Sequence, residues 1–212
     1  MGTSADPKAD LKRADELLSQ ALALDPANAG VHNEKAWLLV AQGRVEEAIA
    51  ERERTLVLDP ADVGAVQGMA QDHLFLGHFE KSLELYDKAI RLSPRDPQLH
   101  WMDNGKSYAH FGLKQYDQAI DWARRAIAVG TSSPFPHATL AAALALTGHE
   151  AEAREALQRY LALPSSARLR TIAALKAFNA RFSGDPRVFE LLERQYEGLR
   201  KAGMPEGPAT TN

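Results

Sequence analysis

Apolar segments of this chain end with the same signal three times. The segments ALALDP, LVLDP and IRLSP place a proline at positions 26, 60 and 94, so the spacing is constant, with 60 − 26 = 34 and 94 − 60 = 34. Gly43 and Gly77 repeat the same spacing, and each is followed by a short polar turn. Glycine accepts the left-handed conformation that ends a helix, and proline is tolerated in the first turn of the next. The pattern therefore predicts two helices in each period.

Two further periods follow, slightly out of register with the first ones. In the earlier one, the positions W-x-x-x-G-x-x-Y-x-x-x-G are filled by Trp101, Gly105, Tyr108 and Gly112. We expect the turn at 112–116 to be about two residues longer than its neighbours. In the later period, Gly148 ends the first helix and Pro164 follows the second. Small residues recur in phase where two helices must approach closely, at Ala14, Ala48, Ser82, Ala119 and Ala153.

The period, glycines, alanines and prolines together resemble the tetratricopeptide-repeat (TPR) family, whose unit is a helix–turn–helix of about 34 residues. The resemblance implies an all-α fold, a right-handed superhelical solenoid of antiparallel helix pairs. The expected divisions are a half repeat at 8–28, repeats at 29–62, 63–97, 98–133 and 134–164, and a capping helix pair at 165–203. Residues 1–7 are expected to be disordered or derived from cloning, and 204–212 to be a disordered tail.

The two ends of the repeat array differ from its interior. The first recognisable piece has the pattern of a second helix whose partner first helix is missing, so we expect the chain to be cut from a longer protein. At the other end, Ala167–Phe182 and Pro186–Ala202 have the pattern of one more helix pair, with a turn at 184–186.

The resemblance also implies a binding surface, the concave face lined by the first helix of each pair. By analogy with the family's inner-face positions, we expect a partner protein or peptide to contact this face. The candidate residues of the first three full repeats are Asn33, Trp37, Val40, Gln67, Gln71, Leu74, Phe75, Met102, Lys106 and His110. The fourth repeat offers Phe135, Ala142 and Leu146.

Some members of the family bind a carboxyl terminus with lysine and asparagine side chains on successive inner-face positions. In this chain the first two positions hold Asn33 and Trp37, and only Lys106 offers a cation. We therefore expect no carboxylate clamp.

Composition and charge narrow the partner. The net charge of −3 gives no basic footprint for nucleic acid, so none is expected. The chain has no apolar run long enough to span a bilayer, no secretory signal pattern and no cysteine, and we expect a cytoplasmic protein that does not bind membranes.

No constellation in the sequence meets the requirements of catalysis, so the chain is not expected to be an enzyme or to hold a cofactor. Gly105-Lys106-Ser107 ends like a phosphate-binding loop but lacks the preceding glycine and strand. No metal site is expected either. His73 and His78 are five positions apart and should point to different sides of one helix.

A narrower resemblance concerns the segments Leu92–Ile127 and Tyr196–Gly207. Both resemble the C-terminal TPR regions of bacterial class III adenylate cyclases and related regulators. This implies the regulatory part of a larger signalling protein. Two other functions remain open: a free-standing adaptor that binds peptides, and a module that forms homo-oligomers through exposed repeat ends.

Overall fold

A computed structural model describes residues 6–130, 132–180 and 184–207 of the chain. All regular elements of these residues are helical, as the sequence predicts. They are α1 (Pro7–Leu24), α2 (Ala29–Ala41), α3 (Val45–Leu58), α4 (Val63–Phe75), α5 (Phe79–Leu92), α6 (Leu99–Gly112), α7 (Tyr116–Ala128), α8 (Phe135–Leu146), α9 (Glu150–Ala162), a 3-10 turn η1 (Pro164–Ser166), α10 (Ile172–Asn179) and α11 (Pro186–Ala202).

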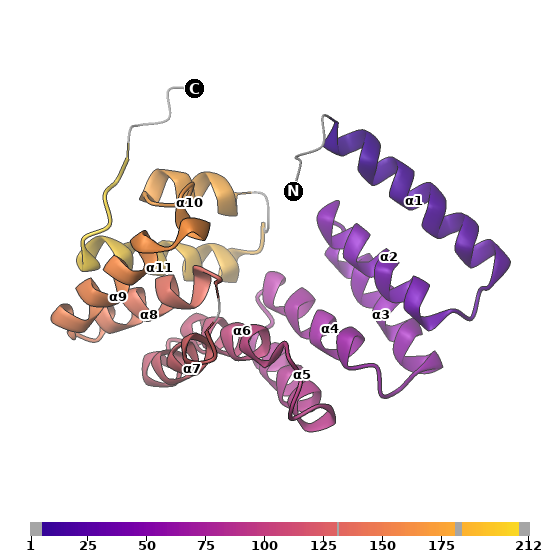
Figure 1. The fold of residues 1–212 in the computed structure, drawn as a ribbon, viewed down its shortest axis with the longest axis horizontal. Helices are drawn as coiled ribbons and strands as arrows, with labels where there is room; N and C mark the ends of the chain where they lie inside the picture. The colour runs from indigo at the N-terminus through magenta and orange to yellow at the C-terminus, as the bar shows by residue number, and fades with distance from the viewer. Residues whose placement is uncertain (1–5, 131, 181–183, 208–212) are drawn as a thin grey trace.

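Four antiparallel pairs form the array: α2 with α3, α4 with α5, α6 with α7, and α8 with α9. Each pair also packs on the next one, and the helices follow one another along an arc from α1 to α9 (Figure 1). The helix starts are defined by short polar side chains. Asn28 and Asp62 precede α2 and α4, and their side chains accept hydrogen bonds from the backbone N–H groups of Val31 and Ala65 in the first turns of these helices.

A left-handed residue lies at the centre of the turn between the helices of each pair. It is Gly43, Gly77 and Gly148 in three pairs and Lys114, with φ of 62°, in the pair of α6 and α7. All four turns contain three residues between the helices, so the expectation of a longer turn after Gly112 is wrong. The extra residues lie before α6, where six residues join α5 to α6 and only four join α3 to α4.

Helix α1 packs on α2, and none of its described side chains is buried. Asp6 accepts hydrogen bonds from the N–H groups of Lys8 and Ala9, and the helix begins at Pro7. The helix therefore starts within the leader that we expected to be disordered at 1–7, and residues 1–5 of that leader lie outside the described part of the chain.

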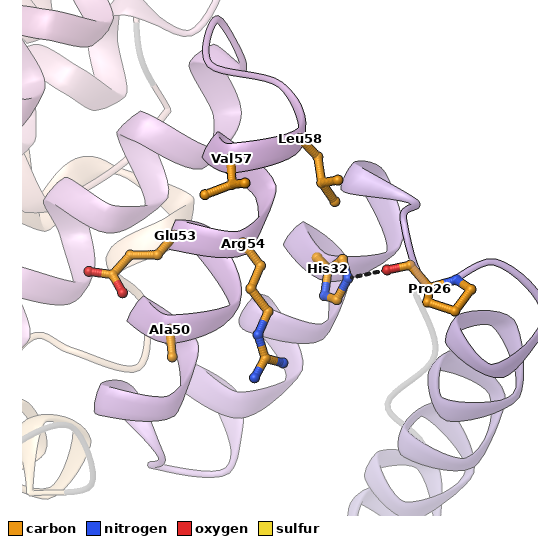
Figure 2. Close-up of a pocket in the computed structure, with 7 residues that line it drawn as sticks. All are labelled: Pro26, His32, Ala50, Glu53, Arg54, Val57 and Leu58. Carbon is orange, nitrogen blue, oxygen red and sulfur yellow. Dashed lines mark hydrogen bonds between the residues drawn. The ribbon is translucent and has the colours of Figure 1, made fainter.

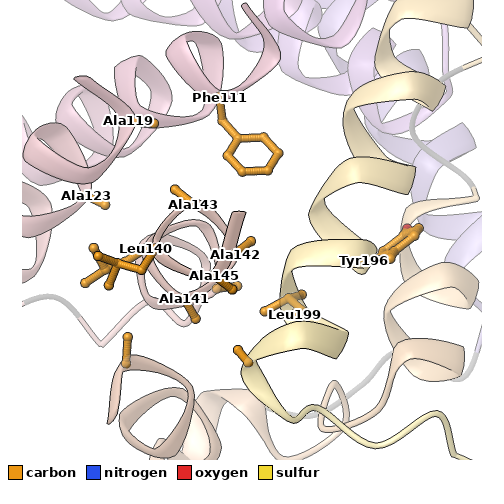
Figure 3. Packing of buried hydrophobic residues seen from close by; sticks show 14 of the residues in the cluster. Phe111, Ala119, Ala123, Leu140, Ala141, Ala142, Ala143, Ala145, Tyr196 and Leu199 are labelled. Carbon is orange, nitrogen blue, oxygen red and sulfur yellow. The ribbon is translucent and has the colours of Figure 1, made fainter. Parts of the chain in front are cut away.

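The C-terminal segment departs from the expected helix pair. Helix α10 begins at Ile172 instead of Ala167, and α11 packs mainly on α8 and only marginally on α10. Figure 3 shows α8 between α7 on one side and α11 on the other. The expected end of the first helix at Phe182 lies outside the described residues.

The described part of the tail, 204–207, is ordered, contrary to our expectation. Met204 is buried in the main core cluster. The carbonyl groups of Pro205 and Glu206 accept hydrogen bonds from the N–H groups of Ile172 and Ala173, at 3.0 and 2.9 Å. These bonds satisfy two of the free donors at the start of α10. Residues 208–212 lie outside the described residues.

Candidate protein-binding surface

The residues of the inner face can be identified by counting sequence positions back from the left-handed residue of each turn. On α8, Ala142 and Thr139 contact α11, so residues six and nine before Gly148 lie on this face. Counting six back from Gly43, Gly77 and Lys114 gives 43 − 6 = 37, 77 − 6 = 71 and 114 − 6 = 108. The equivalent inner-face residues are therefore Trp37, Gln71, Tyr108 and Ala142. Residues four positions apart share one side of a helix, so the same side also holds Asn33, Gln67, Asn104 and Ala138.

This register corrects three candidates of the third repeat. Met102 is fully buried in a cluster with Val66 and Tyr86, so a ligand does not reach it in this conformation. Lys106 is 6% exposed. Its ammonium group binds Asp87 of α5 at 2.5 Å and lies 3.6 Å from the ring centre of Trp122 of α7. Lys106 therefore points between two outer helices and offers no cation to the inner face.

The third candidate, His110, also lies off the inner face. Its Nδ1 is 2.7 Å from the side-chain oxygen of Gln115, across the turn between α6 and α7. Burial lowers the pKa of His110, and the hydrogen bond with Gln115 partly offsets this effect. The expected inner-face positions of this repeat were displaced by two residues, because they were counted from Gly112 and the left-handed turn residue is Lys114.

The candidates of the first two repeats occupy the open part of the inner face. The Trp37 side chain is 43% exposed, and those of Asn33, Val40, Gln67, Gln71 and Phe75 are partly exposed. Leu74 is buried in the core. Asn104 was not among the candidates, although counting back from Lys114 would have identified it. Three amides, Asn33, Gln67 and Asn104, therefore occupy equivalent positions in successive repeats.

A buried arginine supports this surface from behind. Arg52 of α3 donates through Nε to Asp72 of α4 at 2.7 Å and through Nη1 to Asn33 at 2.6 Å. Its guanidinium carbon is 4.2 Å from the ring centre of Trp37. A Cβ on Gly68 would lie only 2.2 Å from this carbon, so glycine makes room for the guanidinium. Arg52 thus fixes two candidate side chains at once.

The carboxyl group of Asp72 is affected by the same burial. Removal from water raises the pKa of Asp72 to about 6, although the charge of Arg52 and its hydrogen bond act in the opposite direction. One period after Arg52, the same place is taken by Tyr86, since 86 − 52 = 34. Its hydroxyl donates to Gln71 at 3.0 Å, so a side chain from an outer helix holds the inner-face residue in this repeat as well.

Helix α11 covers the rest of the inner face. An added Cβ on Gly198 would lie 2.5 Å from the backbone oxygen of Ala142, which shows how closely the two helices approach. Two arginines of α11 donate to carbonyl groups at the ends of other helices, Arg194 to Gly112 at 2.8 Å and Arg187 to Leu76 at 3.4 Å. Cationic groups are favourable at helix C-termini, so α11 is held on α4, α6 and α8 together.

A shallow hollow of about 590 Å³ lies elsewhere, between α3 and the connection of α1 to α2 (Figure 2). Its lining mixes Val57 and Leu58 with Glu53 and Arg54. At its edge, His32 is held by Glu51 at 2.6 Å and by the carbonyl of Pro26 at 3.0 Å.

Among residues 6–130, 132–180 and 184–207, no three histidine, cysteine or acidic side chains come together in a group able to hold a metal ion. None of the described helices is both long and apolar enough to cross a membrane.

Comparisons with known proteins agree with this architecture. Family models of the tetratricopeptide repeat match residues 8–71 and 68–135. The solved structure of PilW, titled a widely conserved type IV pilus biogenesis factor, is 18% identical with a TM-score of 0.70 over 90% of this chain and 83% of that one. PilF of Pseudomonas aeruginosa is 16% identical, with a TM-score of 0.67 over 92% and 88% of the two chains.

YrrB, titled a TPR protein with an unusual peptide-binding site, is 18% identical with a TM-score of 0.58 over 87% of this chain and 90% of that chain. At such identities the likeness concerns the fold alone. No curated protein matches the sequence. Proteins built from stacked repeats generally use their concave faces to bind other proteins. Residues 8–135 consist of tetratricopeptide repeats, and the chain is a TPR solenoid.

Proposed function

We propose that this protein binds an extended segment of another protein along the open part of its inner face, formed by α2, α4 and the first turns of α6. The observation that carries this proposal is the half-exposed ring of Trp37, held in place by Arg52 beside a row of amides. Amide side chains both donate and accept hydrogen bonds, which suits them to pair with a peptide backbone. An exposed tryptophan on a fixed support is a frequent centre of binding energy.

The charge of this surface suggests the chemistry of the partner. The inner-face positions of the first three repeats hold Asn33, Trp37, Gln67, Gln71, Asn104 and Tyr108, none of which is charged at neutral pH. Glu34, the equivalent of Thr139, adds one exposed acidic side chain to this face. We therefore expect a neutral or basic internal segment, and not a free carboxyl terminus, because no lysine or arginine occupies these positions.

Peptides selected from a display library against the intact protein would test the proposal. The affinity of a selected peptide should fall about tenfold or more in Trp37→Ala, since truncation of a central aromatic side chain commonly costs over about 1.4 kcal/mol. Val57→Ala is the control, because Val57 is exposed on α3 away from the inner face. Amidation of the peptide's carboxyl terminus should change nothing. Equal binding by the two variants would contradict the proposal.

Self-association is a second candidate, favoured by the first helix. Leu17 and Leu24 of α1 are exposed, and Leu24 is 88% accessible. Apolar side chains on the outermost helix of a repeat array offer a surface on which another copy packs. In this case light scattering across a hundredfold range of concentration should show a rising mass, and Leu24→Glu should keep the protein monomeric. A constant monomer mass would exclude this function.

The narrower interpretation, a regulatory part of a larger bacterial signalling protein in the cytoplasm, rests on the segments Leu92–Ile127 and Tyr196–Gly207. In that case the inner face would bind a domain of the same polypeptide. Sequencing the complete gene tests this: an upstream catalytic domain would support it, and a reading frame that contains the repeats alone would contradict it.

A further inference from the structure

The turn between α4 and α5 brings two histidines together. His73 lies in the last turn of α4, His78 is the residue before α5, and Gly77 between them has φ of 67°. The sequence expectation placed the two side chains on different sides of one helix. That expectation is wrong, because the left-handed glycine ends the helix and folds the chain back.

The two imidazole rings face each other through the same nitrogen. The Nδ1 atoms are 3.1 Å apart and share a hydrogen bond, and the ring centres are 5.4 Å apart with 42° between the planes. Two nitrogens bound to one zinc ion at 2.0–2.1 Å, with about 100–110° between the bonds, lie roughly 3.1–3.4 Å apart. The hydrogen-bonded separation therefore also falls within the range of two ligands of a single ion.

We propose that His73 and His78 form a binding site for a divalent transition-metal ion, with imidazole-preferring Zn²⁺, Ni²⁺ or Cu²⁺ as the ligand class. Each imidazole binds through Nδ1, and water fills the remaining positions. The ion sits beside the line that joins the two nitrogens. Because His78 is exposed, its ring turns toward the ion without disturbing the core.

Metal binding replaces the hydrogen bond between the two rings. A neutral imidazole carries its proton on one nitrogen only, so the ring that donates through Nδ1 changes to the Nε2–H tautomer when both Nδ1 atoms bind the ion. No third ligand completes the site among the described residues, so the affinity is that of a two-histidine site.

The next repeat provides a natural comparison. His110 and Gln115 occupy the same two positions around the turn at Lys114, and they are joined by a hydrogen bond of 2.7 Å. Residues five apart around these turns thus contact each other in both repeats. A histidine–glutamine pair makes a hydrogen bond but lacks the second imidazole, so the metal site depends on the second histidine and not on the turn alone.

Calorimetric titration of the untagged, full chain with Zn²⁺ or Ni²⁺ tests the proposal. We expect one ion per chain, and a loss of affinity of at least about tenfold in His73→Gln and in His78→Gln. His78→Gln reproduces the pair seen in the next repeat, so it should fold and melt like the original protein. His100→Gln is the control for histidine content, since His100 lies at the start of α6, with its ring centre 5.4 Å from that of Trp101.

A substitution that adds a second histidine to the next turn tests the same geometry in the opposite direction. Gln115→His places a second imidazole opposite His110, and the stoichiometry should rise from one ion per chain to two. Binding that is equally strong in His78→Gln and in the original chain would overturn the assignment of the site. A stoichiometry of one in a folded Gln115→His protein would overturn the argument from turn geometry.

Discussion

The two halves of the inner face are built from opposite kinds of residue. Over α8, a row of alanines faces α11 (Figure 3). An added Cβ on Gly198 of α11 would lie 2.5 Å from the backbone oxygen of Ala142. Over α2 and α4, the equivalent positions hold Trp37 and Gln71, which are large and remain partly exposed. A small side chain six residues before the turn thus allows the close approach of α11 to α8, and large side chains occupy this position where the face is open.

The closed half should be the more sensitive to added volume. In Gly198→Leu the new side chain meets the backbone of Ala142, which has no rotamer with which to move away. We expect a loss of about 3 kcal/mol in the free energy of unfolding, at the upper end of the usual cost of overpacking. Urea denaturation measures it. Gly184→Ala, at a position with free space around it, is the control, and a similar stability of both variants would contradict the close approach.

The open half contains a comparable glycine with a softer neighbour. A Cβ on Gly105 would lie 2.2 Å from the Tyr86 ring, a side chain that is able to shift. Gly105→Leu should cost about 1–3 kcal/mol and less than Gly198→Leu, because part of the strain is relieved. Thermal and urea unfolding of the two variants side by side give the order. A larger loss at Gly105 would reverse the comparison of the two halves.

The repeats made most of the fold predictable. Proline and glycine at a regular interval predicted helices α2 to α5 with correct turns, since these residues act through local backbone conformation. The placement of α11 was not predictable in this way. Its apolar face, which includes Leu199, would suit either one more repeat or the inner face of α8, and only the small size of Ala142 favours the second.

Local turn signals also decided which binding-surface candidates were predicted in the register of the structure. Trp37 and Gln71 lie in the register that Gly43 and Gly77 define. Met102 and Lys106 were misplaced because the third turn uses a lysine where its neighbours use glycine. Arg52 and Asp72 were missed. They lie on different helices, and no sequence spacing indicates that a charged pair is buried between repeats.

The buried pair behind the open half should respond to pH. The pKa of Asp72 is raised from 3.8 to about 6 in the folded protein, so the folded state holds this proton more tightly than the unfolded state. Its contribution to stability is therefore fully present below about pH 4 and falls as the pH rises through about 6. The change should be of the order of 1–3 kcal/mol.

Comparison with Asp72→Asn isolates this contribution from those of other carboxyl groups. The stability of the original protein relative to the variant should decrease between pH 4.5 and pH 7, as measured by urea denaturation at each pH. A difference that stays constant over this range would show that Arg52 keeps the carboxylate ionised throughout.

The smallest effect concerns Lys114, whose left-handed backbone defines the register of the third repeat. Glycine adopts this conformation without steric cost, so Lys114→Gly should relieve about 1 kcal/mol of strain. The substitution also removes an exposed ion pair with Glu190 of 3.0 Å, which is worth up to about 1 kcal/mol. The two effects nearly cancel, and we expect a stability change within about 0.5 kcal/mol of zero. The same substitution at Lys88, in the interior of α5, should cost about 1 kcal/mol, because glycine is unfavourable in a helix. If both variants lose equal stability, Lys114 is not left-handed, and the assignment of Asn104 and Tyr108 to the inner face is then wrong.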